Sequence, residues 1–192
     1  IKREGCKEGP SRETIDISSY NTSVAWYYLT AAYRRGVEEI VVHTTQQTIV
    51  DPLQPKPLKT AEFIKSVVDD FIGMEIIHQT KTQFIIKEIS SLKADEFETI
   101  LRRIFISLNV MFEDILDGIK KDDGAALEEV YVHSDLPINR LVDYDIRMLS
   151  RMPASAMTAY AVLIHLEEIG DAAKYLAKEL ITSSKRKKIS NS

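Results

Sequence analysis

The hydrophobic pattern changes its period near residue 93, and this change limits what the chain can fold into. Before residue 93, short stretches alternate between the two-residue period of strands and the helical period of about 3.6 residues. After it, only long helical patterns remain. We therefore predict an α+β protein, with a small αβ domain over residues 1–92 followed by a helical domain over residues 93–192.

The first domain is predicted to be a small sheet with two helices packed on it, in the order β-α-β-α-β-β. Gly36 and Gly73 are expected to end the two helices. Residues 51–58 contain three prolines and are predicted to form a loop. The aromatic residues 26–28 are expected to pack against the sheet. The predicted strands cover residues 12–17, 37–43, 74–80 and 83–89, and the predicted helices cover residues 21–35 and 59–71.

Three long helical patterns in the second domain predict an antiparallel three-helix bundle over residues 94–121, 125–151 and 153–184. Pro137 interrupts the second pattern, so we expect a kink there or a helix that restarts with Ser134 or Asp135 as its N-cap. The third helix is predicted to face the core with a stripe of Val162, Leu166, Ile169, Ala173, Leu176 and Leu180.

Composition and charge exclude several classes of protein. No apolar run approaches the ~20 residues of a membrane span, so no spanning helix is expected. The single Cys6 cannot form an intramolecular disulfide, which favours a cytoplasmic location. The whole chain has a net charge of −4, and without the four basic residues 185–188 the charge is −8, which disfavours nucleic acid as a partner of the body. The basic residues 185–188 are predicted to be a solvated tail, with contact to phosphates or acidic lipid headgroups as the alternative.

Motifs for catalysis are weak. The Glu-x-x-His pattern typical of di-iron bundles occurs at Glu75 and His78, in a predicted strand rather than in the bundle. There is no Gly-x-Ser-x-Gly turn, phosphate loop or dinucleotide fingerprint. His43, His78 and His165 are each in or beside an apolar element and are predicted to be structural. We therefore predict a protein that is not an enzyme.

Oxygen ligands recur four residues apart in two predicted helices. Glu167 and Asp171 belong to the third helix, on the side away from its predicted core stripe, and Asp135 and Asn139 belong to the second. Like charges at this spacing repel, and a cation would resolve the repulsion. A solvated acidic face is the alternative interpretation. If the two helices are neighbours, the four residues form a candidate shared metal site.

Several segments in order along the chain resemble the PhoU-like phosphate-uptake regulators. The resemblance is closest to the archaeal form, which has a small αβ segment before a single helical domain of PhoU type. It covers nearly the whole chain. The segments that carry it are Tyr33-Arg-Arg-Gly-Val-Glu-Glu-Ile, Gly73-Met-Glu-Ile-Ile, Ile100-Leu-Arg-Arg-Ile-Phe, Met111-Phe-Glu-Asp, residues 140–147 and Leu166-Glu-Glu-Ile-Gly-Asp-Ala.

The resemblance implies metal clusters on the bundle surface, held by motifs in which an acid is followed four residues later by Asp. Glu167 and Asp171 match one motif, and Asp135 matches the first half of the other, where Asn139 replaces the usual Asp. Iron, zinc or nickel is the implied metal. Asn139 and Pro137 depart from the family pattern and are expected to weaken binding, with His133 or Asp143 as compensating ligands.

The resemblance also implies a function and partners. It predicts a non-enzymatic regulator of phosphate transport or phosphate signalling that contacts the ATPase of a phosphate ABC transporter or a signalling protein. A homodimer that brings two bundles together is expected. The alternative is the effector or dimerisation part of an AbrB-type transcription regulator. Under that interpretation, DNA would be bound only through an upstream domain that precedes Ile1.

Overall fold

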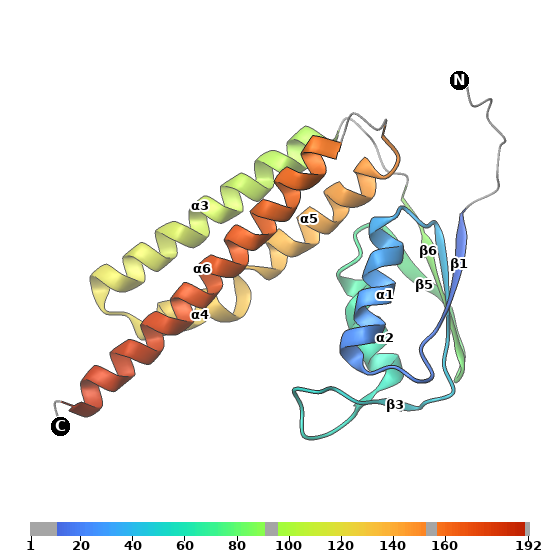
Figure 1. Ribbon diagram of the computed structural model, residues 1–192, viewed down its shortest axis with the longest axis horizontal. Helices are drawn as coiled ribbons and strands as arrows, with labels where there is room; N and C mark the ends of the chain where they lie inside the picture. Colours follow the sequence, from blue (N-terminus) through green and yellow to red (C-terminus); the bar gives the residue numbers. More distant parts are fainter. Residues whose placement is uncertain (1–10, 91–95, 153–156, 191–192) are drawn as a thin grey trace. The chain divides into compact units, whose positions relative to one another are not determined.

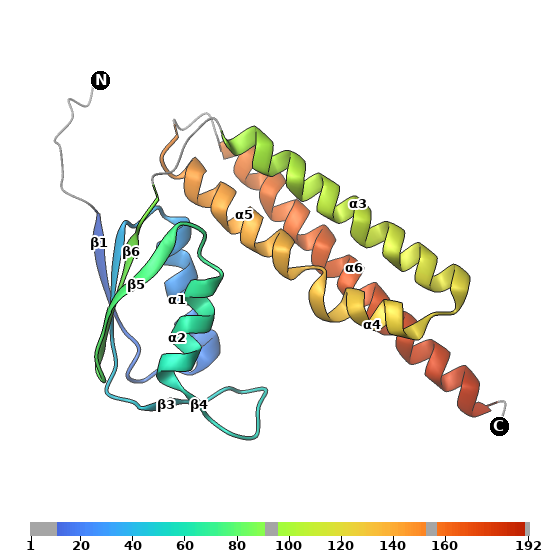
Figure 2. The same ribbon diagram turned by 180° about the vertical axis from the view of Figure 1, so that it is seen from behind.

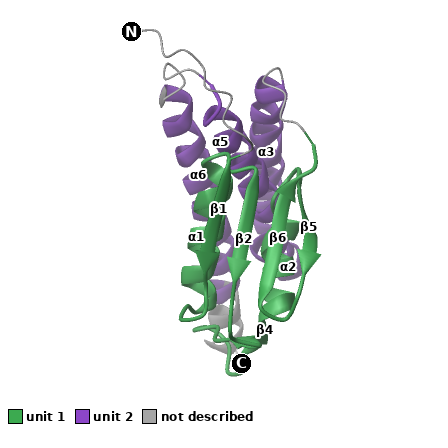
Figure 3. Cartoon of the chain, turned by 90° about the vertical axis from the view of Figure 1, so that its right-hand side faces the viewer, with its two compact units in different colours: residues 1–92 green, residues 93–192 purple. Residues whose placement is uncertain are grey.

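The computed structural model of this chain describes residues 11–90, 96–152 and 157–190, with the side chains of residues 157 and 184–190 left out. It divides the chain into two compact units, residues 1–92 and 93–192 (Figure 3). The protein is α+β, with a small mixed sheet of four strands followed by helices, as the sequence predicts.

The αβ unit has its four main strands in the order β1-β2-β6-β5 (Figure 1). β1 and β2 are parallel, and the other neighbouring strands are antiparallel. Figure 3 shows α1 and α2 together behind one face of this sheet, while the opposite face carries no helix of the unit. The elements are β1 (Arg12–Asp16), α1 (Thr22–Arg34), β2 (Glu39–His43), β3 (Thr48–Ile49), β4 (Leu58–Lys59), α2 (Thr60–Asp69), β5 (Met74–Gln79) and β6 (Gln83–Glu88).

The predicted order of elements in the αβ unit is confirmed, and one small pair was missed. The proline-containing loop connects β3 and β4, which pair with each other as a separate two-stranded ribbon. Gly36 and Gly73 follow α1 and α2 with φ angles of 80° and 83°, a conformation that suits glycine because it lacks a Cβ atom. Tyr33 stacks on Phe71 at 4.4 Å and donates a hydrogen bond to the Ile72 carbonyl, which ties α1 to the end of α2.

The prediction for the aromatic residues of α1 is wrong. Trp26, Tyr27 and Tyr28 are 45%, 64% and 43% exposed rather than packed on the sheet. The core-facing side of α1 carries Ala25, Leu29, Ala32 and Tyr33, and the two alanines allow the helix to approach the sheet closely. Tyr28 instead contacts Tyr27 edge-on and stacks on Tyr20.

The helical unit contains α3 (Phe97–Lys121), α4 (Gly124–His133), α5 (Leu136–Leu149) and α6 (Met157–Ser190). Figure 2 shows α3 and α6 side by side, with α4 and α5 following each other along both. The predicted restart near Pro137 is confirmed, because α5 begins at Leu136 and Pro137 lies in its first turn. There the missing N–H of proline costs no helical hydrogen bond. Within the described ranges, no helix is long and apolar enough to cross a membrane.

The buried seam of α6 differs from the predicted stripe. Val162, Ile169 and Leu176 are 41%, 43% and 48% exposed, so their prediction as core residues is wrong. The seam carries small residues, and a Cβ on Gly170 would lie 3.7 Å from Ile138 of α5 and from Leu108 of α3. Close packing of the helices therefore buries the side of α6 that has small residues, and the larger side chains stay exposed. The seam consists of Leu163, Leu166, Gly170, Ala173, Ala177 and Ile181.

Candidate functional site

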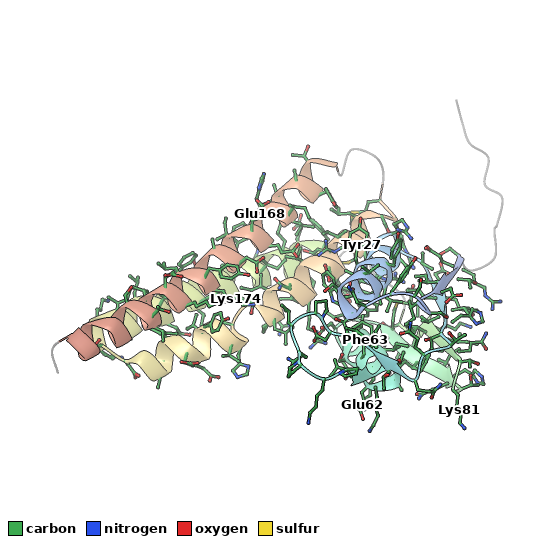
Figure 4. All side chains as sticks on the ribbon, turned by 60° about the horizontal axis from the view of Figure 1, so that its bottom comes forward. Tyr27, Glu62, Phe63, Lys81, Glu168 and Lys174 are labelled. Atoms are coloured by element: carbon green, nitrogen blue, oxygen red, sulfur yellow. The ribbon has the colours of Figure 1, made fainter. Side chains whose placement is uncertain are left out.

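Asp135 is the N-cap residue of α5, and its side chain pairs with a lysine instead of bonding to the helix. Its side chain is buried, and its carboxylate accepts a hydrogen bond from Lys174 Nζ at 2.6 Å. Figure 4 labels Lys174 on α6. Burial acts against the ammonium, yet the hydrogen bond to Asp135 and the charges of Asp135 and Asp171 raise the pKa of Lys174. The prediction of Asp135 as the N-cap residue of α5 is confirmed, although its side chain makes no capping hydrogen bond to the helix.

The other predicted ligands lie around this ion pair. Asn139 is one turn beyond Asp135, and its Oδ1 atom is buried with no hydrogen-bond partner among the described residues. Asp171 is exposed one turn before Lys174. Glu167, a further turn back, is half-buried and lies beside the α6 seam, not opposite the core as predicted. The structure therefore brings Asp135 and Asp171 near Lys174, while Asn139 lies one turn beyond Asp135 on α5.

These residues fit a metal ion only if Lys174 moves. Among the described residues, no three His, Cys, Asp or Glu side chains converge on a common point, and this includes His133 and Asp143. The Asp135 carboxylate already has the Lys174 ammonium as its counter-ion. A divalent cation that used the oxygens of Asp135 and Asn139 would have to displace this ammonium.

Asp145 of α5 is a buried acid that the sequence analysis missed. Its side chain has no exposed surface, and neither carboxylate oxygen has a hydrogen-bond partner in the described part of the chain. Burial raises its pKa to about 8. The spacing of the apolar residues could have predicted this burial, because Asp145 lies on the core-facing seam of α5 with Ile138, Val142 and Leu149.

An exposed apolar stripe follows α3 beside its buried seam. Phe105, Phe112, Leu116 and Ile119 are 48%, 38%, 53% and 47% exposed. With a rotation of about 100° per residue, these four residues lie on the same flank of α3 as Leu108. Leu108 approaches Gly170 of α6. The opposite flank carries Gly118, which packs against Leu127 of α4. The stripe therefore lies on the side of α3 next to α6.

A matching stripe follows α6. Val162, Ile169 and Leu176 are separated by seven residues each and share one flank of the helix. The opposite flank carries Lys174, which reaches Asp135, and Lys178, which lies over the Tyr131 ring of α4. Because that flank faces α4 and α5, the exposed stripe lies on the side of α6 next to α3.

The two stripes border the same groove between α3 and α6, on the side away from α4 and α5. We call this surface the α3–α6 apolar face; it leaves roughly 600 Å² of apolar side chain exposed, at the upper end of patches found on monomeric proteins. Its members are Phe105, Phe112, Leu116, Ile119, Val162, Ile169 and Leu176.

No protein-family model, no curated protein and no solved structure matches this chain. The function is therefore argued from the residues and their geometry.

Proposed function

We propose that this protein is a non-enzymatic regulator of the PhoU-like class that controls phosphate transport or phosphate signalling by binding another protein. In this proposal the helical unit is a three-helix bundle of PhoU type, in which α4 and α5 together are its interrupted middle helix. The ordered sequence segments that resemble this family support the assignment. The ion pair between Asp135 and Lys174 supports it further, because it places the start of α5 beside α6, the two helices expected to share the metal site.

The observation that carries the proposal is the α3–α6 apolar face. A soluble bundle has no folding reason to leave seven large apolar side chains together in water, so a partner that covers them is the simplest account. The exposed area approaches the ~800 Å² that each partner contributes to a stable complex. We infer that the partner is the ATPase of a phosphate ABC transporter or a phosphate-signalling protein.

Metal binding has a secondary place in the proposal. We infer that Asp135, Asn139, Glu167 and Asp171 bind a divalent cation in competition with Lys174, which supplies the positive charge when no metal is bound. Asn139 contributes an amide oxygen in place of a carboxylate, so the site has one negative charge fewer than two complete acidic motifs. Metal would fix the start of α5 against α6, on the flank opposite the α3–α6 apolar face.

A pull-down with matched variants tests the proposal. Tagged full-length protein is recovered from phosphate-replete cells, and co-purifying proteins are identified by mass spectrometry. Leu116→Glu places a charge in the α3–α6 apolar face, while Val132→Glu places one at a similarly exposed position on α4 (49% exposed). The proposal expects the transporter ATPase or signalling protein with wild type and Val132→Glu, and its loss with Leu116→Glu.

Two outcomes would count against the proposal. Wild-type protein that recovers no phosphate-transport or phosphate-signalling component removes the proposed partners. Equal recovery by wild type and Leu116→Glu, with both proteins folded by circular dichroism, moves the contact away from the α3–α6 apolar face.

A further inference from the structure

The outer edge of β1 is regular, and among the described residues no strand pairs with it. Ser11 O accepts from Glu39 N, and Ile17 N donates to His43 O, so the odd-numbered residues of this strand direct their backbone groups toward β2. In a parallel pair the alternate residues then direct theirs to the other side. The N–H and C=O groups of Arg12, Thr14 and Asp16 therefore point outward, and these three residues are exposed.

The two edges of the four-stranded sheet are protected differently. β5 carries an irregularity between Ile76 and His78, and such bulges discourage pairing with another strand. β1 has none, since its register with β2 runs unbroken from Arg12↔Glu39 to Asp16↔His43. It also contains no proline. Regular edges of this kind are templates for strand addition.

The charges along β1 are self-complementary about Thr14. Arg12 and Asp16 lie on the sheet face away from α1 and α2, because Ile15 between them faces the core. Antiparallel pairing of two β1 strands centred on Thr14 would place each Arg12 opposite Asp16 of the other copy. Opposite charges at directly paired positions stabilise a sheet. Hydrogen bonds from Ser18 lower the pKa of Asp16, which keeps this carboxylate charged.

We propose that two copies of this chain pair through β1, antiparallel and related by a two-fold axis at Thr14, to form one continuous eight-stranded sheet. The outward groups of Arg12, Thr14 and Asp16 would supply about six backbone hydrogen bonds across the axis. Arg12 also binds Glu39 through Nε at 3.1 Å, which leaves its terminal N–H groups for the second copy. Such a dimer is isologous, the commonest form of protein oligomer.

Analytical ultracentrifugation of the full chain over a concentration series tests this dimer. Thr14→Pro removes the outward N–H without breaking the hydrogen bonds to β2, and proline is tolerated at such edge positions. We expect its dimer dissociation constant to rise at least about tenfold, because two hydrogen bonds across the axis are lost. The matched control Thr14→Val keeps the N–H and should dimerise like wild type. Circular dichroism establishes that both variants are folded.

A mixing experiment tests the charge pairing itself. Asp16→Lys and Arg12→Glu should each weaken the homodimer, since like charges then meet at both ends of the strand pair. An equal mixture of the two variants should dimerise more strongly than either alone, because every pair in the heterodimer is again opposite in charge. Arg12→Glu also removes the ion pair with Glu39, but this change is present in the Arg12→Glu homodimer and in the heterodimer alike. It therefore does not account for a difference between them.

Three results would overturn the proposal. These are a wild type that stays monomeric over the whole series, a Thr14→Pro variant that dimerises like wild type, and a mixture that dimerises no better than its components. The dimer does not rest on the proposed function, since the transporter pull-down can succeed or fail independently of it. Dissociation by Leu116→Glu but not by Thr14→Pro would place self-association on the helical unit instead.

Discussion

Replacing Asp145 with Asn should stabilise the protein and remove a large part of its pH dependence. In the folded chain Asp145 is fully buried and has no hydrogen-bond partner among the described residues, and burial raises its pKa from 3.8 to about 8. In the unfolded chain the carboxyl is exposed and titrates near its ordinary value. Between these two pH values the folded state therefore binds one proton more than the unfolded state.

The sign and size of the effect follow from this difference. Because the unfolded state binds fewer protons, the free energy of unfolding falls as pH rises, by about 1.4 kcal/mol per pH unit. The penalty begins near pH 4, reaches about 4 kcal/mol at pH 7 and levels off above about pH 8. Asn has a similar size and cannot ionise, so Asp145→Asn should be more stable than wild type by about 4 kcal/mol at pH 7.

Urea unfolding followed by far-ultraviolet circular dichroism measures this difference from about pH 5 to about pH 8. The gap between wild type and Asp145→Asn should widen steadily with pH. Asp117→Asn is the control of opposite sign, because the hydrogen bond and charge of Lys121 lower the pKa of Asp117. Its contribution is lost only as pH falls toward acid. Parallel stability profiles for wild type and Asp145→Asn would refute the assignment of Asp145 as a buried, unpaired acid.

Two further changes in the helical unit have expected outcomes. Lys174→Met should lower the free energy of unfolding by about 2–3 kcal/mol, because Asp135 stays buried without its counter-ion. Added zinc or manganese should restore thermal stability in this variant alone. Failure of either metal to do so would count against the metal site. Gly118→Ala should be less stable than Gly124→Ala by about 1–2 kcal/mol, since the new Cβ would lie 2.9 Å from Leu127 Cγ, whereas nothing lies within 4 Å of the Cβ at position 124. Equal unfolding midpoints for the two alanine variants would contradict this packing.

The sequence predicts the order of elements well because each element carries its own local signal. The alternation of polar and apolar residues predicts β1, and the run of β-branched residues predicts β2. Gly36 and Gly73, which were predicted to end α1 and α2, adopt the left-handed conformation. The β3–β4 ribbon was missed because two-residue strands are too short to show a period.

Helix faces were harder to predict than helices. Both α1 and α6 carry two apolar sides, and in each case the side with the larger residues was predicted to face the core. The structure buries the side with alanine and glycine, such as Ala32 in α1 and Gly170 in α6, because small residues allow close approach. The exposed large residues of α6 become its part of the α3–α6 apolar face, and those of α1 form its exposed aromatic group. Spacing alone does not distinguish these two sides.

The candidate site was predicted only in part for a related reason. The four-residue spacings located Asp135, Asn139, Glu167 and Asp171, but the spacing gave no indication that Lys174 would pair with Asp135. This pair joins residues from two helices and depends on how the helices pack. Asp145 was missed because an acid on an apolar seam is usually read as an exposed position.

Photocrosslinking from the α3–α6 apolar face tests the proposed function most directly. A photoreactive amino acid replaces Leu116 in full-length protein expressed in phosphate-replete cells, and crosslinked proteins are identified by mass spectrometry. The same substitution at Val132 of α4 is the control. The proposal predicts a crosslink from position 116, absent from position 132, to a phosphate-transporter ATPase or a phosphate-signalling protein. Crosslinks only to unrelated proteins, or the same products from both positions, would contradict it.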